Sequence, residues 1–340
     1  MKNIRIDWVD IAKGLCMILL LYHHTVTGGH GTFRFHDEGL LLADRYLGTF
    51  REPIFFFTSA MFFKTYDDFR LFAIHKVNKL LVPFFSLFLF LSVPVMWWKS
   101  GVIMGGVISL FSFIYPEQFY NYPIWFLWCL FLVYILFYAI RLIATHFKNF
   151  SFALFTISFV IGLFGYMLGY FQWNLPAFLD TSMTALPFFA MGHLFAIYRE
   201  NIMKSRLYKY WPLTLSLFVL IAVLLAGSGD PVFARNEYRQ SFIELYGCGV
   251  SGIAIVLLIA SKLPAIPFLS WFGRSTLVVL LVHRPLLEVV LKALLPYNLP
   301  EPLLALFTVT ILIVLFFVIV PGMNRFFPYT TAHKNLFRYT

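Results

Sequence analysis

Long apolar runs alternate with short polar breaks along almost the whole chain. Each run has, or nearly has, the roughly 20 residues that an α-helix needs to cross a bilayer. Breaks rich in glycine, proline or acidic residues separate the runs. The runs cover residues 9–25, 46–64, 80–98, 124–142, 152–171, 183–198, 211–227, 242–260, 270–291 and 303–321. The pattern predicts an all-α polytopic membrane protein with about ten transmembrane helices.

Composition excludes a soluble globular protein and a disordered one. Hydrophobic residues make up 60% of the 340 residues and charged residues only 12%, whereas an average soluble domain is about 25% charged. A water-facing fold of this size would lack the charges to cover its surface. We therefore expect one transmembrane domain over residues 1–340, with no additional soluble domain.

The net charge of +10 is explained by membrane topology. Ten spans with a cytoplasmic N-terminus would place 16 of the 26 lysines and arginines on the cytoplasmic side and seven on the other side. Basic residues collect in the cytoplasmic loops of membrane proteins, so both termini are predicted to be cytoplasmic. The expected partner is therefore a lipid bilayer, and no nucleic acid is expected.

Three smaller features refine this topology. The run from Val102 to Tyr115 is too short for a crossing, so we expect residues 101–123 to be re-entrant or interfacial. Asp10 and Lys13 interrupt the first run, which favours a helix that stays in the protein over a cleaved signal peptide. The three cysteines are scattered, which predicts buried free thiols rather than disulfides or a metal site.

The first span carries ionisable residues that are costly inside a membrane and are therefore candidates for function. Asp10 and Lys13 are three residues apart and can pair on one helix face. His24 follows Lys13 by eleven residues, which places it within about 20° of the same face and about 16 Å further along the axis. His23 points elsewhere. The alternative is a structural Asp–Lys pair with a histidine that is bonded by a neighbouring helix.

The ninth span contains a second group of ionisable residues. Arg284 and Glu288 are four residues apart and can neutralise each other. His283 precedes them, and Pro285 removes one helical hydrogen-bond donor beside them. His283 lies about as deep in its span as His24 does in the first, so the two could meet. The alternative is a buried ion pair that only fixes helix packing.

Two lysines, Lys76 and Lys79, lie one helical turn apart after the second span, in a segment predicted as a loop from Phe69 that leads into the start of a helix. An ammonium group is a common phosphate ligand, so the pair is a candidate grip for an anionic cytosolic cofactor. The alternative is ordinary positive-inside anchoring of the topology.

Five short motifs occur in an order that is more specific than any one of them. They are Asp10, Lys13-Gly14 and His24; Pro53-Ile54-Phe55-Phe56-Phe57-Thr58-Ser59-Ala60; Lys76, Lys79 and Pro83; Trp125-Phe126-Leu127; and Gly273, Ser275 and His283. In this order the chain resembles the integral-membrane acyltransferase family 3, and most of all its branch of fucose-4-O-acetylase-like sugar O-acetyltransferases. Two positions depart from that pattern: Ala60 replaces a glycine, and Glu52 stands where the branch often has histidine.

The resemblance implies transfer of an acyl group, usually acetyl, from cytosolic acyl-CoA (acetyl-CoA) to a hydroxyl of a cell-surface or lipid-linked glycan, without a metal. It implies that His24 and His283 are catalytic, His24 as general base. It also implies a bacterial cytoplasmic (inner) membrane location. The anionic end of CoA would meet Lys13, Lys76 and Lys79. Supporting roles fall to Asp10, Ser59, Trp125, Ser275, Arg284 and Glu288.

Two other functions compete with this interpretation. A transporter or flippase for a lipid-linked or anionic small molecule would use the same intramembrane charges without chemistry, although the sequence shows no inverted repeat. An inactive binding protein built on the acyltransferase fold is the second, and the departures at Ala60 and Glu52 are its support.

Overall fold

The computed structural model of the chain describes residues 7–27, 32–66, 68–100, 120–226, 232–238 and 241–338. Within these ranges every regular element is a helix, apart from one isolated β-bridge between Val232 and Glu237. The predicted all-α class is therefore confirmed for the described residues. Most of the stretch 101–123, which was predicted not to cross the membrane, lies outside them.

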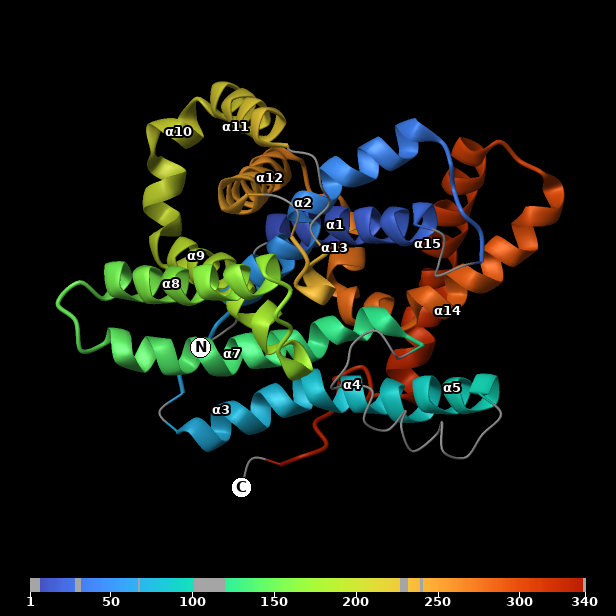
Figure 1. Ribbon diagram of the computed structural model, residues 1–340, viewed down its shortest axis with the longest axis horizontal. Coiled ribbons are helices and arrows are strands. Elements are labelled where there is room, and N and C mark those ends of the chain that lie inside the picture. Colours follow the sequence, from blue (N-terminus) through green and yellow to red (C-terminus); the bar gives the residue numbers. More distant parts are fainter. Residues whose placement is uncertain are drawn as a thin grey trace. The chain divides into compact units, whose positions relative to one another are not determined.

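The chain forms two compact units. The first unit comprises Met1–Thr58, Tyr198–Asp230 and Gln240–Pro321, and the second comprises Ser59–Ile197, Pro231–Arg239 and Gly322–Thr340. Both units are assembled from segments that lie far apart in the sequence. Figure 1 gives the helix labels used below.

Helices from both ends of the chain build the first unit. They are α1 (Asp7–Val26), α2 (Glu38–Met61) up to Thr58, α10 (Arg206–Lys209), α11 (Trp211–Leu225), α12 (Phe242–Lys262), α13 (Pro267–Arg274), α14 (Thr276–Leu294) and most of α15 (Glu301–Phe326). Local signals set their starts. Asp37 accepts a hydrogen bond from the backbone N–H of Leu40 at the start of α2, and Ser241 and Glu244 form a capping box at α12.

The closest helix packing of the first unit is between α1 and α13. A Cβ atom added to Gly14 would collide with the backbone of Leu269, and one added to Gly273 would collide with the backbone oxygen of Asp10. Small residues let membrane helices approach until their backbones touch. These two glycines therefore fix the position of α13 against the Asp10–Lys13 end of α1.

The second unit is built mainly from the middle of the chain. Its helices are α3 (Phe69–Lys76), α4 (Val82–Leu87), α5 (Val93–Ser100), α7 (Trp125–Ala144), α8 (Phe150–Tyr170) and most of α9 (Leu179–Lys204). Asp68 caps α3 by accepting a hydrogen bond from the N–H of Arg70. The segment that carries Lys76 and Lys79 is therefore helical from Phe69 onward, which corrects the predicted loop.

Two π-helical segments, Val77–Leu81 and Phe88–Ser92, join α3, α4 and α5 into one continuous helical stretch. Each of them ends two residues before a proline, Pro83 or Pro94. Because proline has no N–H to donate to the carbonyl four residues earlier, a widened turn at this point accommodates it. The prolines thus widen the helix locally without ending it.

Six helical stretches in the described residues are long and apolar enough to cross a membrane, so the predicted number of about ten is not confirmed. They are Asp7–Val26, Phe69–Trp98, Tyr122–Ala144, Phe150–Tyr170, Phe242–Lys262 and Glu301–Phe326. The predicted span 46–64 lies in α2, which carries Asp44, Arg45, Arg51 and Glu52. The predicted span 270–291 is wrong as one helix, because the chain breaks at Ser275 between α13 and α14.

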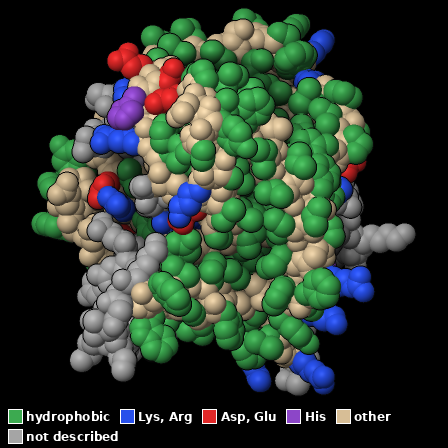
Figure 2. Space-filling view, turned by 90° about the vertical axis from the view of Figure 1, so that its right-hand side faces the viewer, with side chains coloured by type: hydrophobic (Ala, Val, Ile, Leu, Met, Phe, Trp, Pro, Cys, Tyr) green, Lys and Arg blue, Asp and Glu red, His purple; other side chains and the backbone are tan. Residues whose placement is uncertain are grey.

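Large apolar side chains are exposed on the outside of many helices. Phe90, Trp98 and Val318 are 84%, 89% and 76% exposed, and Figure 2 shows hydrophobic side chains over much of one face. Such surfaces suit contact with lipid rather than water. The three cysteines, Cys16, Cys129 and Cys248, are buried free thiols, as predicted.

Candidate active site

The end of α1 opposite Asp10 carries two histidines, of which His24 was predicted to be catalytic. His23 and His24 lie in its last turn, and the hydroxyl of Tyr22 donates a hydrogen bond of 2.8 Å to the backbone oxygen of Leu40 in α2. Glu301, at the start of α15, accepts hydrogen bonds of 2.7 Å from the backbone N–H groups at residues 36 and 37. The side chain of Glu301 thereby holds the backbone just before α2 against the start of α15.

Three imidazole rings meet at this end of α1, and we call them the histidine cluster: His23, His24 and His283. The ring centroids of His24 and His283 are 4.8 Å apart, and those of His23 and His24 are 4.9 Å apart. The structure therefore brings together the two histidines that the sequence singled out, from α1 and α14. It adds a third, His23, which the sequence analysis directed elsewhere.

His283 is completely buried, and its protonation pattern follows from its hydrogen bonds. Its Nδ1 lies 2.9 Å from the backbone oxygen of Val279 and 3.1 Å from that of Leu280. A carbonyl oxygen only accepts hydrogen bonds, so Nδ1 must carry the hydrogen. Nε2 of the neutral ring then holds the lone pair. Among the described residues, this Nε2 has no hydrogen-bond partner, which leaves it available to a substrate proton.

The predicted ion pair beside His283 is present but long. Arg284 Nε and Glu288 Oε1 are 3.9 Å apart, with the side chains 9% and 18% exposed. The pair lies on α14 at the i, i+4 spacing that the sequence indicated. The two charges offset each other next to the neutral ring of His283.

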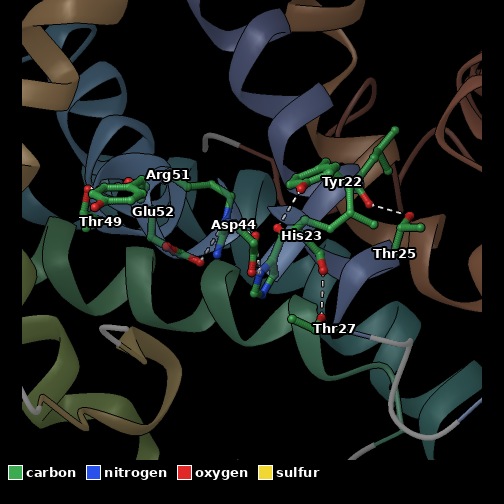
Figure 3. A network of polar contacts seen from close by, with 11 residues as sticks. Tyr22, His23, Thr25, Thr27, Asp44, Thr49, Arg51 and Glu52 are labelled. Carbon is green, nitrogen blue, oxygen red and sulfur yellow. Dashed lines mark hydrogen bonds and ion pairs between the residues drawn. The ribbon is translucent and has the colours of Figure 1, made fainter. Parts of the chain in front are cut away.

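His23 belongs to a chain of ionisable side chains that reaches along α2, and we call it the carboxylate network: His23, Asp44, Arg51 and Glu52. His23 Nδ1 lies 2.8 Å from Asp44 Oδ2 and 3.0 Å from Asp44 Oδ1. The guanidinium of Arg51 lies 3.1 Å from Asp44 and 3.5 Å from Glu52. Figure 3 shows the four side chains in sequence from α1 into α2.

The sequence analysis missed the roles of Asp44 and Arg51, although a signal was present. They are seven residues apart, which is about two turns, so they share one face of α2. Two opposite charges on one face of a helix indicate a pair, and both side chains are nearly buried here, at 9% and 4% exposed.

Asp10 and Lys13 lie at the other end of α1, about 21 Å and about 16 Å from His24 by the helical rise. Asp10 acts electrostatically on Lys13, in agreement with the predicted pair.

Ser275 lies in the break between α13 and α14, and its hydroxyl donates to the backbone oxygen of Trp271 at 2.9 Å. This hydrogen bond gives Ser275 a structural role at the break between the two helices.

The remaining predicted residues lie in the second unit. The ammonium of Lys76 is 3.4 Å from the ring centroid of Tyr134, and the Tyr134 hydroxyl donates to the backbone oxygen of Ser59 at 2.9 Å. Lys79 donates to the backbone oxygen of Ala332 at 2.5 Å. Trp125 is buried with its ring 5.5 Å from that of Phe178. Both lysines thus have partners within the protein, and their role in cofactor binding stays a prediction.

The part of the chain that the structure describes holds no group of three His, Cys, Asp or Glu side chains arranged for a metal ion. What the histidine cluster offers is acid–base chemistry. His283 presents a lone pair, and His23 is hydrogen-bonded to a carboxylate. An imidazole nitrogen with a lone pair can accept a proton, and an imidazole N–H can return one.

Comparison with known proteins assigns the family. The model of the family described as an acyltransferase domain, acyltransferase family 3, matches residues 6–321. No curated protein and no solved structure matches the chain. The match covers both α1 and α14, which carry the histidine cluster. Its length and the apolar helices together show that the chain is an integral-membrane acyltransferase and belongs to acyltransferase family 3.

Proposed function

We propose that this protein is a membrane-bound O-acyltransferase that moves an acetyl group from acetyl-CoA to a hydroxyl of a glycan. The observation that carries the proposal is the lone pair on His283 Nε2, next to the ring of His24. Two backbone carbonyls fix this tautomer, because they accept the hydrogen on Nδ1. A fixed, unprotonated imidazole nitrogen is what the deprotonation of an alcohol requires. Ion binding alone would not require a fixed tautomer.

The reaction needs one proton to leave an alcohol and one to reach a thiolate. His24 takes the proton of the acceptor hydroxyl. At the same time, the oxygen of that hydroxyl attacks the carbonyl carbon of the thioester. A carbon–oxygen bond forms, the carbon–sulfur bond breaks, and the sulfur leaves with the electron pair and receives a proton. His283 accepts a hydrogen bond through Nε2, either from the hydroxyl or from the ring of His24. A general base contributes about 10²–10⁴-fold to the rate.

The donor would bind with its reactive end at the histidine cluster and its anionic end at Lys13. Lys13 lies about 16 Å along α1 from His24, a distance comparable to the length of the slim arm of CoA. In the second unit, Lys76 and Lys79 are separate candidates for binding a phosphate. A phosphate would have to replace the ring of Tyr134 at Lys76 and the carbonyl of Ala332 at Lys79.

The glycan acceptor rests on the resemblance to the sugar O-acetyltransferase branch, with a lipid-linked or cell-surface sugar at a bacterial cytoplasmic membrane. The test is mass analysis of acetyl esters on envelope glycans from cells with and without the protein. His283→Asn is the sharpest variant, because its amide nitrogen can replace Nδ1 as donor to Val279 but offers no lone pair at the position of Nε2.

We expect acetyl esters to disappear without the protein and to fall about 100-fold or more with His283→Asn at an equal amount of membrane-inserted protein. Acetylation that does not depend on the protein, together with loss of transport of a lipid-linked sugar, would favour the transporter instead.

A further inference from the structure

The two outer members of the histidine cluster lie in opposite electrostatic settings. His283 Nδ1 faces neutral carbonyls, and the complete burial of the ring disfavours a positive charge on it. His23 Nδ1 faces the carboxylate of Asp44 at 2.8 Å. Where two titratable groups of one site have such different surroundings, the difference separates the acid from the base.

The charges of the carboxylate network show what His23 does. Arg51 bridges Asp44 and Glu52, so its one positive charge is shared by two negative charges. With a neutral His23 the network carries one uncompensated negative charge in largely buried surroundings, because Asp44, Arg51 and Glu52 are only 9%, 4% and 20% exposed. A buried uncompensated charge is costly. One proton on His23 removes it.

The position of His23 allows that proton to be used. Its Nδ1 is engaged by Asp44, so the proton that can be given away is on Nε2. The side chain is 24% exposed, whereas His283 is fully buried. The rings of His23 and His24 are in edge contact, with centroids 4.9 Å apart. A substrate bonded to His24 would therefore lie beside an available N–H of His23.

We propose that His23, hydrogen-bonded to the carboxylate of Asp44, is the general acid of the acyl transfer, a role that rests on the proposed function. As the carbon–sulfur bond breaks, the electron pair goes to sulfur, and the sulfur takes the proton from His23 Nε2. The proton that His24 removed from the acceptor hydroxyl then restores His23. The net change is one thioester and one alcohol converted to one ester and one thiol.

Several charged groups face His23 and bear on its pH dependence. His24 lies beside it on α1, and Asp44, Arg51 and Glu52 extend from it on α2. From α14, His283 and Arg284 face the histidine cluster. The acid is active only while it is protonated, so its contribution is present at low pH and is lost as the pH rises. A base acts only while it is unprotonated, so the contribution of His24 and His283 is lost as the pH falls.

The test uses the full chain in proteoliposomes, with acetyl-CoA as donor probe and envelope glycans from cells lacking the protein as acceptor. His23→Asn keeps an amide donor to Asp44 but has no transferable proton. Asp44→Asn removes the charge and leaves Arg51 its contact with Glu52. Tyr22→Phe is the matched control, because it breaks another contact between α1 and α2 without removing a group of the network.

We expect His23→Asn and Asp44→Asn each to lower kcat for CoA release about 100-fold, with KM for acetyl-CoA unchanged. The residual activity should no longer decline at alkaline pH, and Tyr22→Phe should behave as wild type. Wild-type rates in both variants, or a lower rate with an unchanged pH profile, would overturn the role of His23. If the wild type releases no CoA, or if His24→Ala is fully active, the proposed function fails instead.

Discussion

In the first unit, imidazoles meet a carboxylate and backbone carbonyls, and Arg51 lies between two acids. In the second unit, the ammonium of Lys76 lies over the ring of Tyr134, and Lys79 bonds to a carbonyl. A proton can leave or join the first kind of group with its partners still in place. The second kind is an amine whose partners are an aromatic ring and a backbone carbonyl. The proposed acid–base chemistry therefore rests on groups of the first unit, and the proposed anion binding rests on the lysines of the second.

His24→Ala should break the comparison most visibly. Loss of the base is expected to lower acyl transfer by about 10²–10⁴-fold, while the amount of folded protein in the membrane stays normal. His36→Ala is the matched control, because that histidine is exposed and its bond to Glu301 uses only the backbone N–H. Transfer rates per inserted molecule decide it. Near-normal acetylation by His24→Ala would move the chemistry away from the histidine cluster.

Arg284→Leu and Glu288→Leu test whether the paired charges of the first unit depend on each other. Removing one member of a largely buried pair costs about 3–5 kcal/mol, and the N–O distance of 3.9 Å favours the low end. Each single change should therefore reduce folded protein, and the double leucine variant should partly recover it. Membrane-inserted protein and its thermal stability provide the measurement. A double variant that is no better than the worse single one would contradict the coupling.

Gly273→Ala tests the backbone contact that positions α13 against α1. The added methyl group would meet the backbone oxygen of Asp10, and overpacking of this kind costs about 1–3 kcal/mol. We expect lower thermal stability in detergent. Gly322→Ala is the control, because a Cβ there meets nothing within 4 Å and alanine favours a helix. Equal stability of the two variants would show that α1 and α13 can separate at little cost.

Lys76→Ala and Lys79→Ala address the second unit and should have the smallest effects. If the lysines bind the anionic end of acyl-CoA, each change raises KM for acetyl-CoA by about tenfold, equivalent to about 1.4 kcal/mol, and Lys→Arg retains more function than Lys→Ala. KM for the acceptor should change less. An unchanged KM for acetyl-CoA together with lower stability would make both lysines structural, as their contacts with Tyr134 and Ala332 would then suffice to explain them.

Sequence patterns predicted the helices that are apolar throughout. The run 152–171 is found as Phe150–Tyr170, and the run 242–260 as Phe242–Lys262, because hydrophobic length alone decides such segments. The start of α2 and the break at Ser275 were missed. The first depends on Asp37 and Glu301, whose contacts are tertiary, and the second on the close approach of Gly273 to α1.

The candidate site divides in the same way. The pairing of Arg284 with Glu288 follows from spacing within one helix, so it could be predicted. The contact of His23 with Asp44 joins two helices through a turn, and helical periodicity carries no information about it. Periodicity placed His23 and His24 on different faces of α1, but it could not show that α2 would place a carboxylate on the face of His23.

The contact between Glu301 and the backbone at residues 36 and 37 joins segments that are more than 260 residues apart. At a synthesis rate of about 5–20 residues per second, the turn after α1 is made roughly 13–50 seconds before the side chain that holds it. The interval between the synthesis of His24 and that of His283 is almost as long. The contact between the rings of His24 and His283 can therefore form only after about 260 further residues have been synthesised. A chain released before α14 is made has His23 and His24 but lacks His283, the ring that His24 contacts.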